Sequence, residues 1–233
     1  MVFTLYDNKA INVGILLDLP FREGIRARTS DIAKPHHKVD LVNTPTWANV
    51  NSLGVLELDG LTEYLQSLGA GSADLDFTNG DYSFGVWIKC TDTGTSEMII
   101  GRYVLSNNGW EIYLFNNGLD FTLTLRHHHA AGATTRTACF STGWTPGAWL
   151  FIGISRQGAA AIHYRNGVAV PTTHGVGGLI DPEPCVGDMV IGARYTKNAD
   201  FYRGQMWRPR IWNRVLTPAE WKTIYELERS KFV

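Results

Sequence analysis

Apolar and polar residues alternate near the end of the chain, over residues 207–211. Trp207, Pro209 and Ile211 are separated by Arg208 and Arg210. Successive side chains of a strand point to opposite faces, so this pattern is typical of a strand with one buried face. The sequence therefore predicts a half-buried strand that leads directly into the last element of the chain.

This last element carries the signals of a helix start. Thr217 can cap the first turn, Pro218 stands at the first helical position, and Glu220 completes a capping box. Apolar residues recur at helical spacing over residues 221–225, which gives the helix one apolar stripe. We expect this stripe to pack against a sheet.

The rest of the chain predicts strands and tight turns. Asn-Gly pairs suit the positive φ angles of hairpin turns, and they separate residues 110–115 from 121–125 and residues 160–164 from 168–170. No helical periodicity of useful length precedes residue 217. The predicted fold class is therefore all-β, with one short C-terminal helix.

Several spaced motifs resemble the laminin-G-like domains of the concanavalin A-like lectin/glucanase superfamily. The motifs over residues 15–24, 54–65 and 77–89 occur in the family's order, with Tyr82, Phe84, Val86 and Ile88 on one face of a strand. The family's closing motif matches at Gly204, Met206, Arg210, Ile211, Trp212, Asn213, Arg214, Leu216, Thr217 and Glu220. Its two acidic positions are Trp207 and Arg208 in this chain, so the acidic pair that holds calcium or substrate in some members is lost.

This resemblance implies a two-sheet antiparallel jelly-roll sandwich over residues 14–233, closed by the short C-terminal helix. Residues 1–13 precede the resemblance and predict an N-terminal arm or an extra hairpin, with strands at residues 2–6 and 10–13. The fold by itself specifies function poorly, because it carries lectins, adhesion modules, enzymes and structural parts.

The composition of the chain limits the classes of partner that the protein is expected to bind. The chain has 233 residues with 21 Lys and Arg against 22 Asp and Glu, which argues against the basic excess of a nucleic-acid-binding protein. No apolar run approaches the length of a membrane span, and no secretory signal is visible, so we expect a virion or cytoplasmic protein without membrane partners. Cys90, Cys139 and Cys185 show no metal spacing and predict free or buried thiols, with one disulfide plus a free thiol as the alternative.

Aromatic residues beside Asn-rich turns are the candidates for binding a glycan. In a lectin, exposed aromatic rings stack on sugar rings, and Asn side chains supply hydrogen bonds. The predicted glycan-binding residues are Tyr103, Asn107, Asn108, Trp110, Tyr195 and Asn198.

Two other clusters raise the question of a metal. Asp74, Asp76, Asn79 and Asp81 offer four oxygen donors in eight residues, which makes calcium the one candidate cofactor, against ordinary turn residues as the alternative. In His127-His-His129 only His127 and His129 could share a metal, because alternate residues of a strand point to one face. We interpret this run as an exposed loop or strand end.

Glu57 and Glu63 are the residues that a glycoside hydrolase would use. The strand of related enzymes places a nucleophile and an acid on one face, and the six-residue spacing keeps that parity only if the strand is unbroken. Gly60 interrupts the segment, so we expect no catalysis.

The sequence therefore predicts a non-catalytic recognition or scaffolding module. The leading hypothesis is a structural or decoration component of a larger assembly such as a phage or virus particle, with other protein subunits, including copies of this chain, as partners. The alternative is a lectin-like module that binds surface glycans with calcium assistance, and a glycoside hydrolase ranks last.

Overall fold

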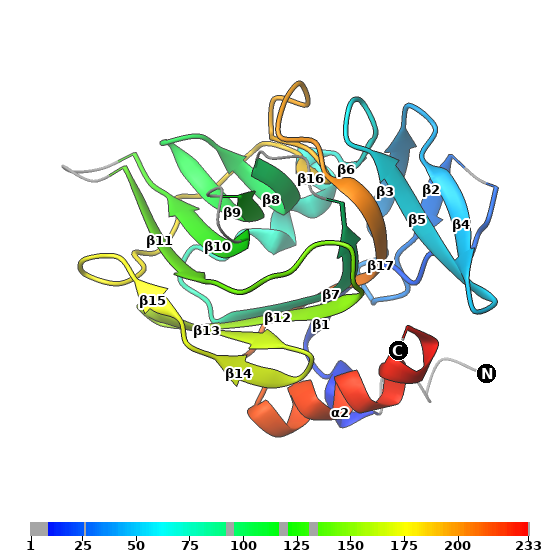
Figure 1. Cartoon of the computed structure of the whole chain (residues 1–233). Coiled ribbons are helices and arrows are strands. Elements are labelled where there is room, and N and C mark those ends of the chain that lie inside the picture. Colours follow the sequence, from blue (N-terminus) through cyan, green and yellow to red (C-terminus); the bar gives the residue numbers. More distant parts are fainter. Residues whose placement is uncertain (1–8, 26, 92–95, 117–120, 131–134, 233) are drawn as a thin grey trace.

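The structure, a computed structural model, describes residues 9–25, 27–91, 96–116, 121–130 and 135–232. Two antiparallel sheets face each other, and the only α-helix of the described residues, α2, lies on the outer side of one of them (Figure 1). This arrangement confirms the predicted jelly-roll sandwich with one short C-terminal helix. The chain passes several times from one sheet to the other, so some neighbouring strands, such as β7 and β17, are distant in sequence.

Within the described residues the first sheet has eight strands and the second has nine. The eight-stranded sheet runs β14 (Val168–Val170), β13 (Ala160–Arg165), β12 (Leu150–Gln157), β7 (Tyr82–Cys90), β17 (Arg203–Trp212), β5 (Leu53–Asp59) and β4 (Thr46–Val50), with β1 (Ile15–Asp18) beside β17. The nine-stranded sheet runs β15 (Thr173–His174), β11 (Arg136–Ser141), β10 (Phe121–His128), β9 (Asn108–Asn116), β8 (Ser96–Val104), β16 (Met189–Ile191), β6 (Tyr64–Ser67), β3 (Lys38–Val42) and β2 (Arg28–Ser30). The helical elements are η1 (Ala10–Asn12), η2 (Gly69–Leu75), α2 (Pro218–Glu228) and η3 (Arg229–Lys231).

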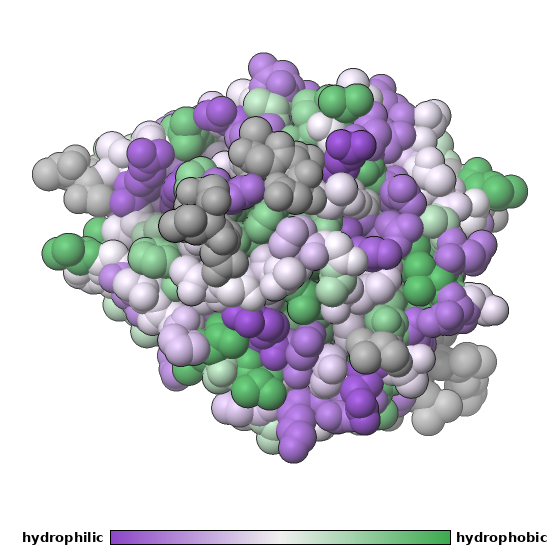
Figure 2. Space-filling view, viewed as in Figure 1, coloured by the Kyte–Doolittle hydropathy of each residue, from purple (hydrophilic) through white to green (hydrophobic). Residues whose placement is uncertain are grey.

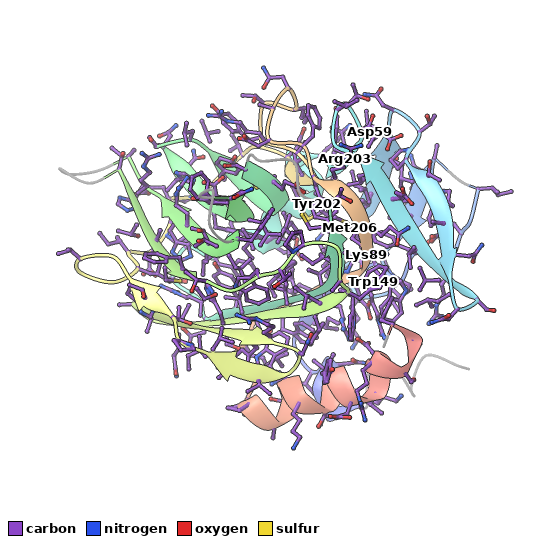
Figure 3. All side chains as sticks on the ribbon, viewed as in Figure 1. Asp59, Lys89, Trp149, Tyr202, Arg203 and Met206 are labelled. Carbon is purple, nitrogen blue, oxygen red and sulfur yellow. The ribbon has the colours of Figure 1, made fainter. Side chains whose placement is uncertain are left out.

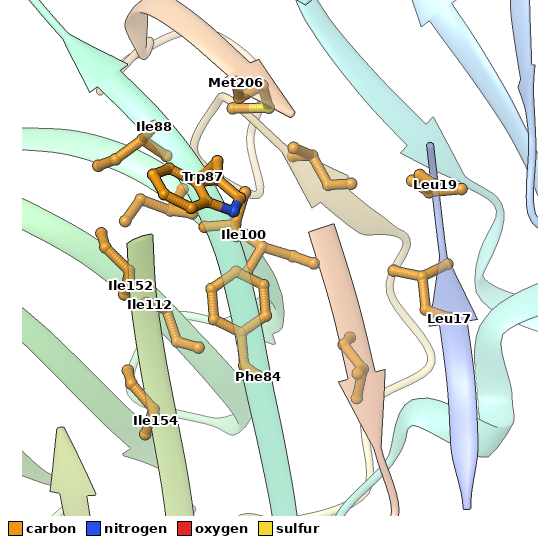
Figure 4. Close-up of a cluster of buried hydrophobic side chains, with 14 of the residues drawn as sticks. Leu17, Leu19, Phe84, Trp87, Ile88, Ile100, Ile112, Ile152, Ile154 and Met206 are labelled. Carbon is orange, nitrogen blue, oxygen red and sulfur yellow. The ribbon is translucent and has the colours of Figure 1, made fainter. Parts of the chain in front are cut away.

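The core fills the space between the two sheets. Phe84 of β7 and Ile152 of β12 point into it from one sheet, and Ile100 of β8 and Ile112 of β9 from the other (Figure 4). The predicted face of β7 is confirmed, because its alternating side chains are all buried. Burial of each such side chain contributes roughly 1.5–3 kcal/mol to folding, so this interior is the main source of stability.

The start of α2 has the predicted capping box. The Thr217 hydroxyl accepts a hydrogen bond from the Glu220 backbone N–H at 3.3 Å, and the Glu220 carboxylate accepts one from the Thr217 backbone N–H at 2.8 Å. Pro218 follows the cap, where no backbone donor is needed. These local contacts begin the helix where the sequence predicts it.

Helix α2 is held to the eight-stranded sheet by Trp221. Its ring lies over Gly85 and Gly153, which are direct cross-strand partners in β7 and β12. A Cβ atom at Gly153 would come within 2.8 Å of the ring, so the two glycines leave the space that the indole fills. The Trp221 Nε1–H also donates to the Ser155 hydroxyl at 2.9 Å, which fixes the orientation of the ring.

The strand β17 differs from its predicted regular alternation. A bulge interrupts its pairing with β7 between Trp207 and Arg210, and Arg208 has a φ of 54°. Trp207 and Arg210 consequently share the face of β17 that lies opposite Trp87 and Gly85 of β7. Arg210 is buried because α2 covers this face, and it bonds to Glu228 of α2 at 2.8 Å. A bulge adds a residue to one strand and changes the face of those that follow.

The described part of the N-terminal segment contacts the end of β17. Residues 10–12 form η1, so the strand predicted for residues 10–13 is wrong, and residues 1–8 lie outside the described residues. Trp212 donates its Nε1–H to the Ile11 carbonyl at 2.8 Å, and Arg214 donates to the Val13 carbonyl at 2.7 Å. Two side chains of the C-terminal part of the chain thus bond to the backbone of this short turn.

Two expectations from composition concern the state of the cysteines and a membrane span. Cys90, Cys139 and Cys185 are buried, and no disulfide joins them in the described residues. In the part of the chain that is described, no helix combines the length and the hydropathy that a membrane crossing requires.

Replacing Gly153 by Ala should destabilise the protein by about 1–3 kcal/mol, because the added methyl group overlaps the fixed Trp221 ring. The measurement is the free energy of unfolding in urea. Gly80→Ala is the matched control, since a Cβ atom there meets nothing within 4 Å. Equal stability of the two variants would contradict this account of how α2 docks.

Candidate functional site

The structure brings two of the predicted glycan-binding residues into contact. The ring centroids of Tyr103 and Tyr195 are 4.9 Å apart. Tyr195 is half-buried, whereas Tyr103 is only 2% exposed, so the prediction of a surface ring at Tyr103 is wrong. Asn107 and Asn198 are exposed, and Asn108 is half-buried at the start of β9.

Trp110 lies in the core instead of on the surface. It faces inward with Ile112 and Leu114 on β9, and its Nε1–H donates to the Leu75 carbonyl at 2.8 Å. Its predicted role in stacking on a sugar is therefore wrong. The position beside an Asn-Gly turn indicated a surface, but strand alternation decides the face that a side chain occupies.

The same alternation points other side chains of β9 to β11 away from the core. We call this set the outer-face patch, and it consists of Tyr113, Phe115, Thr124, Arg126 and Phe140. Phe115 is 45% exposed and Phe140 is 38% exposed, which is unusual for such large apolar rings. Thr124 is directly opposite both Tyr113 and Phe140 in the sheet, so the patch is continuous across three strands.

Sequence reasoning missed the outer-face patch. The signal was present in the hairpin of β9 and β10, because inward Ile112 and Leu114 require Tyr113 and Phe115 to point outward. Exposed aromatic rings next to hydroxyl and guanidinium groups are the usual components of a sugar-binding surface.

A buried ionic network fixes Arg126 within the patch. Glu111, 3% exposed at its side chain, accepts a hydrogen bond from Arg126 Nη1 at 2.8 Å. Arg126 also donates to the Tyr113 hydroxyl, and its guanidinium lies 4.7 Å from the centre of that ring. The Arg126 side chain is still 24% exposed, so its remaining donors can reach a ligand.

His128 and Tyr103 complete the support of Glu111. The Ser106 backbone N–H donates to His128 Nδ1 at 3.1 Å, so Nε2 carries the proton and donates to Glu111 at 3.1 Å. Burial alone would raise the pKa of Glu111, but the bonds from His128, the charge of Arg126 and the bond from Tyr103 hold it below its ordinary value. Burial and the Glu111 carboxylate in turn raise the pKa of Tyr103, whose hydroxyl remains a donor. Glu111 is thus a fixed anion beneath the patch.

The histidine run is buried rather than exposed, so that interpretation is wrong. His127 points inward, where the Tyr82 hydroxyl lies 2.8 Å from Nε2 and the Ile180 carbonyl 2.9 Å from Nδ1. Burial lowers the pKa of His127 to about 4, because the charged ring would lose its hydration. His129 is 3% exposed. Strand β10 continues to His128, which points to the outer face, where Tyr103 and Glu111 cover it.

The four predicted calcium ligands do not converge. The Asp74 carboxylate bonds to His37 at 2.8 Å, Asp76 to the buried Arg102 at 3.0 Å, and Asp81 to the Gly158 backbone N–H at 2.9 Å. Across the described ranges, no three His, Cys, Asp or Glu residues are grouped so that they could hold a metal ion. The calcium hypothesis is therefore not supported at Asp74, Asp76 and Asp81, because donors of the chain itself already bond to these three carboxylates.

Asp74 belongs to an ionic triplet with His37 and Asp31. His37 Nδ1 lies 2.7 Å from Asp31, and its Nε2 lies 2.8 Å from Asp74. Asp31 also accepts the backbone N–H groups of Asp18 and Ala33, which ties β1 to the following loop. Burial alone would lower the pKa of His37, but the hydrogen bonds and charges of the two carboxylates raise it to about 9.

Glu57 and Glu63 line one open hollow of about 380 Å³. The hollow lies where β5 pairs with the start of β17, at Asp59 and Arg203 (Figure 3). Glu57 accepts a hydrogen bond from Gln205 at 2.8 Å, and Glu63 accepts one from the Asp59 backbone N–H at 2.9 Å. Burial and the neighbouring carboxylates raise the pKa of Glu63. The structure thus brings together the two carboxylates that the hydrolase hypothesis requires.

Comparison with known proteins shows the family to which the chain belongs. A family model described as the concanavalin A-like lectin/glucanases superfamily, of laminin G type, matches residues 62–220. The match covers more than half of the chain, so the chain belongs to this superfamily. Among curated proteins, no sequence matches.

Similar solved structures come from botulinum neurotoxins. The binding domain of serotype D superposes with a TM-score of 0.71 at 14% identity, over 94% of this chain and 53% of that one. A serotype D ligand-binding domain in complex with N-acetylneuraminic acid gives 0.69 at 15% identity, over 94% and 52%. The type G receptor-binding domain gives 0.67 at 13% identity, over 92% and 51%. The chain therefore spans about half the length of these domains, and the similarity at this identity establishes the fold alone.

Stability should fall as the pH rises from 6.5 through 9, because only the folded state keeps His37 protonated in that interval. The expected loss is up to about 3 kcal/mol, measured as the free energy of unfolding in urea at pH 6.5 and pH 9.5. The stabilisation is fully present below pH 6.5, where both states bind the proton.

His37→Gln should remove this drop, whereas His36→Gln should retain it, since the His36 ring bonds to the Asp31 backbone carbonyl and not to the Asp31 carboxylate. The same drop in both variants would show that the ionic triplet is not its cause.

Proposed function

We propose that this protein is a non-catalytic binding module that recognises a glycan through the outer-face patch. The observation that carries the proposal is the pair of exposed rings, Phe115 and Phe140, beside an arginine that a buried carboxylate holds in place. Single exposed apolar residues are common, but two on adjacent parts of one sheet face, with polar groups between them, favour a ligand surface.

Each group in the patch has a distinct role. The phenyl rings of Phe115 and Phe140 pack against the apolar faces of sugar rings, which removes both surfaces from water. Arg126 donates to sugar hydroxyls or to a carboxylate. Its bonds to Glu111 and Tyr113 fix its rotamer before binding, so less side-chain entropy is lost when the ligand arrives.

An acidic sugar is the ligand class that we favour. Arg136 of β11 is exposed and acts electrostatically on Tyr113, so a second positive charge lies near Arg126. A guanidinium binds a carboxylate with a charge-assisted hydrogen bond. The structural neighbour of serotype D was solved with N-acetylneuraminic acid, a sugar of this class, which supports the choice.

Binding ranks above hydrolysis because of the surroundings of the two carboxylates. The described residues that line their hollow are Thr46, Glu57, Leu58, Asp59, Glu63, Thr91, Arg203 and Gly204. None of them is aromatic, so the hollow lacks a platform for a sugar ring next to Glu57 and Glu63. The outer-face patch has such platforms.

Phe115→Ala and Phe140→Ala should each weaken binding of a sialylated oligosaccharide at least about tenfold, which corresponds to about 1.4 kcal/mol of lost ring contact. The measurement is isothermal titration calorimetry. Ile162→Ala, which removes an equally exposed apolar side chain from β13 in the other sheet, is the control and should bind as the wild type does.

Unchanged affinity of both Phe variants would refute the outer-face patch as the binding site. Release of shortened sugars during the titration would instead favour the hydrolase hypothesis, and Glu63→Gln would then be tested for loss of that release.

A role as a subunit of a larger assembly, such as a phage or virus particle, is our second proposal. The strands β4 and β14 close the two ends of the eight-stranded sheet, and no described strand pairs with their outer edges. An N-terminal segment of another copy can add to such an edge through backbone hydrogen bonds. The face shown in Figure 2 mixes hydrophilic and hydrophobic residues, which favours an edge contact over a broad apolar interface.

Removal of residues 1–8 should then convert an oligomer into a monomer, as measured by light scattering after gel filtration. Truncation at residue 8 keeps the residues that Trp212 and Arg214 bind, so the fold is not disturbed. A monomer at both lengths would exclude assembly through this segment.

A further inference from the structure

A separate hollow lies on the side of the sandwich that carries α2. It measures about 290 Å³ and is lined by Lys9, Ile11, Asn12, Arg208, Arg210, Ile224, Leu227, Glu228 and Lys231. These residues come from the N-terminal segment, from β17 and from the C-terminal helices, which meet beside the end of α2 (Figure 1). The outer-face patch is on the other sheet, so the two sites are independent.

Positive charge exceeds negative charge in this hollow. Arg208 binds both oxygens of Asp18 at 2.9 Å, and it shares Glu228 with Arg210. These two arginines and two carboxylates balance each other. In the described residues, Lys9 and Lys231 form no ion pair, so two positive charges remain, more than the partial negative charge at the end of α2 offsets.

A buried donor at the hollow has no acceptor. Arg210 is 5% exposed, and its Nε–H is buried without a hydrogen-bond partner among the described residues. Its Nη2 is used by Glu228. Buried donors in folded proteins are almost always paired, so an unpaired one at a positively charged hollow indicates an acceptor that comes from outside the chain.

We propose that this hollow binds a phosphoryl-type oxyanion. Lysine ammonium groups act on phosphate as point charges, and Lys9 and Lys231 supply two of them. Arg210, whose buried Nε–H has no partner among the described residues, is a further donor residue in the lining. One water occupies about 30 Å³ of liquid, so about 290 Å³ accommodates a phosphate group with part of its hydration shell.

Inorganic phosphate should raise the melting temperature of the wild-type protein more than chloride does at equal ionic strength, because it binds the folded state alone. Lys9→Ala/Lys231→Ala should lose this difference and bind phosphate at least about tenfold more weakly in calorimetry. Lys222→Ala, which removes an exposed lysine of α2 that is not part of the lining, should keep the wild-type response.

The Nε–H resonance of Arg210 in a ¹H–¹⁵N NMR spectrum gives a readout that needs no substitution, and it should shift as phosphate is added. Tighter binding of glycerol phosphate than of inorganic phosphate would identify the ligand as the phosphoryl group of a larger molecule, and the reverse would identify the free ion. Equal effects of phosphate and chloride, with no shift of the Arg210 resonance, would overturn the proposal.

Discussion

The contact of Trp221 with the paired glycines of β7 and β12 decides which of the two sheets the helix covers. A side chain at either glycine would occupy the place of the indole ring, so the two glycines allow the helix to pack at this position. The helix therefore covers the eight-stranded sheet. No α-helix of the described residues covers the outer face of the nine-stranded sheet, and Phe115 and Phe140 are partly exposed there.

The C-terminal end of α2 is held by a residue that differs from the family motif. Where other members carry an acidic pair, Trp207 and Arg208 occupy the bulge of β17. Arg208 binds Asp18 and Glu228, and Trp87 donates its Nε1–H to Glu228 at 2.9 Å. The cation at position 208 thus joins β1 to the helix, through Asp18 and Glu228.

Local sequence signals predicted the helix and the strands, whereas contacts between residues that are distant in sequence determine the partners of the candidate site residues. The capping box of α2 and the inward face of β7 could be read from neighbouring residues. The face of Trp110 could not be read from its Asn-Gly neighbours, because it follows from the alternation along β9, which puts Trp110 on the inward face with Ile112 and Leu114. The same holds for Asp74 and Asp76, whose partners His37 and Arg102 lie 37 and 26 residues away. Because Asp74 and Asp76 are close in sequence, we predicted that both bind one calcium ion, but the fold gives each of them a different partner.

The network under the outer-face patch also determines which substitutions can report on binding. Glu111 is buried, and its charge is compensated by Arg126 and by donors from His128 and Tyr103. Loss of Arg126 would leave a buried carboxylate short of its cation, a change that costs stability as well as affinity. The phenyl rings of Phe115 and Phe140 have no such second role, because they are partly exposed and support no buried charge. A change in affinity on their removal is therefore attributable to the ligand contact itself.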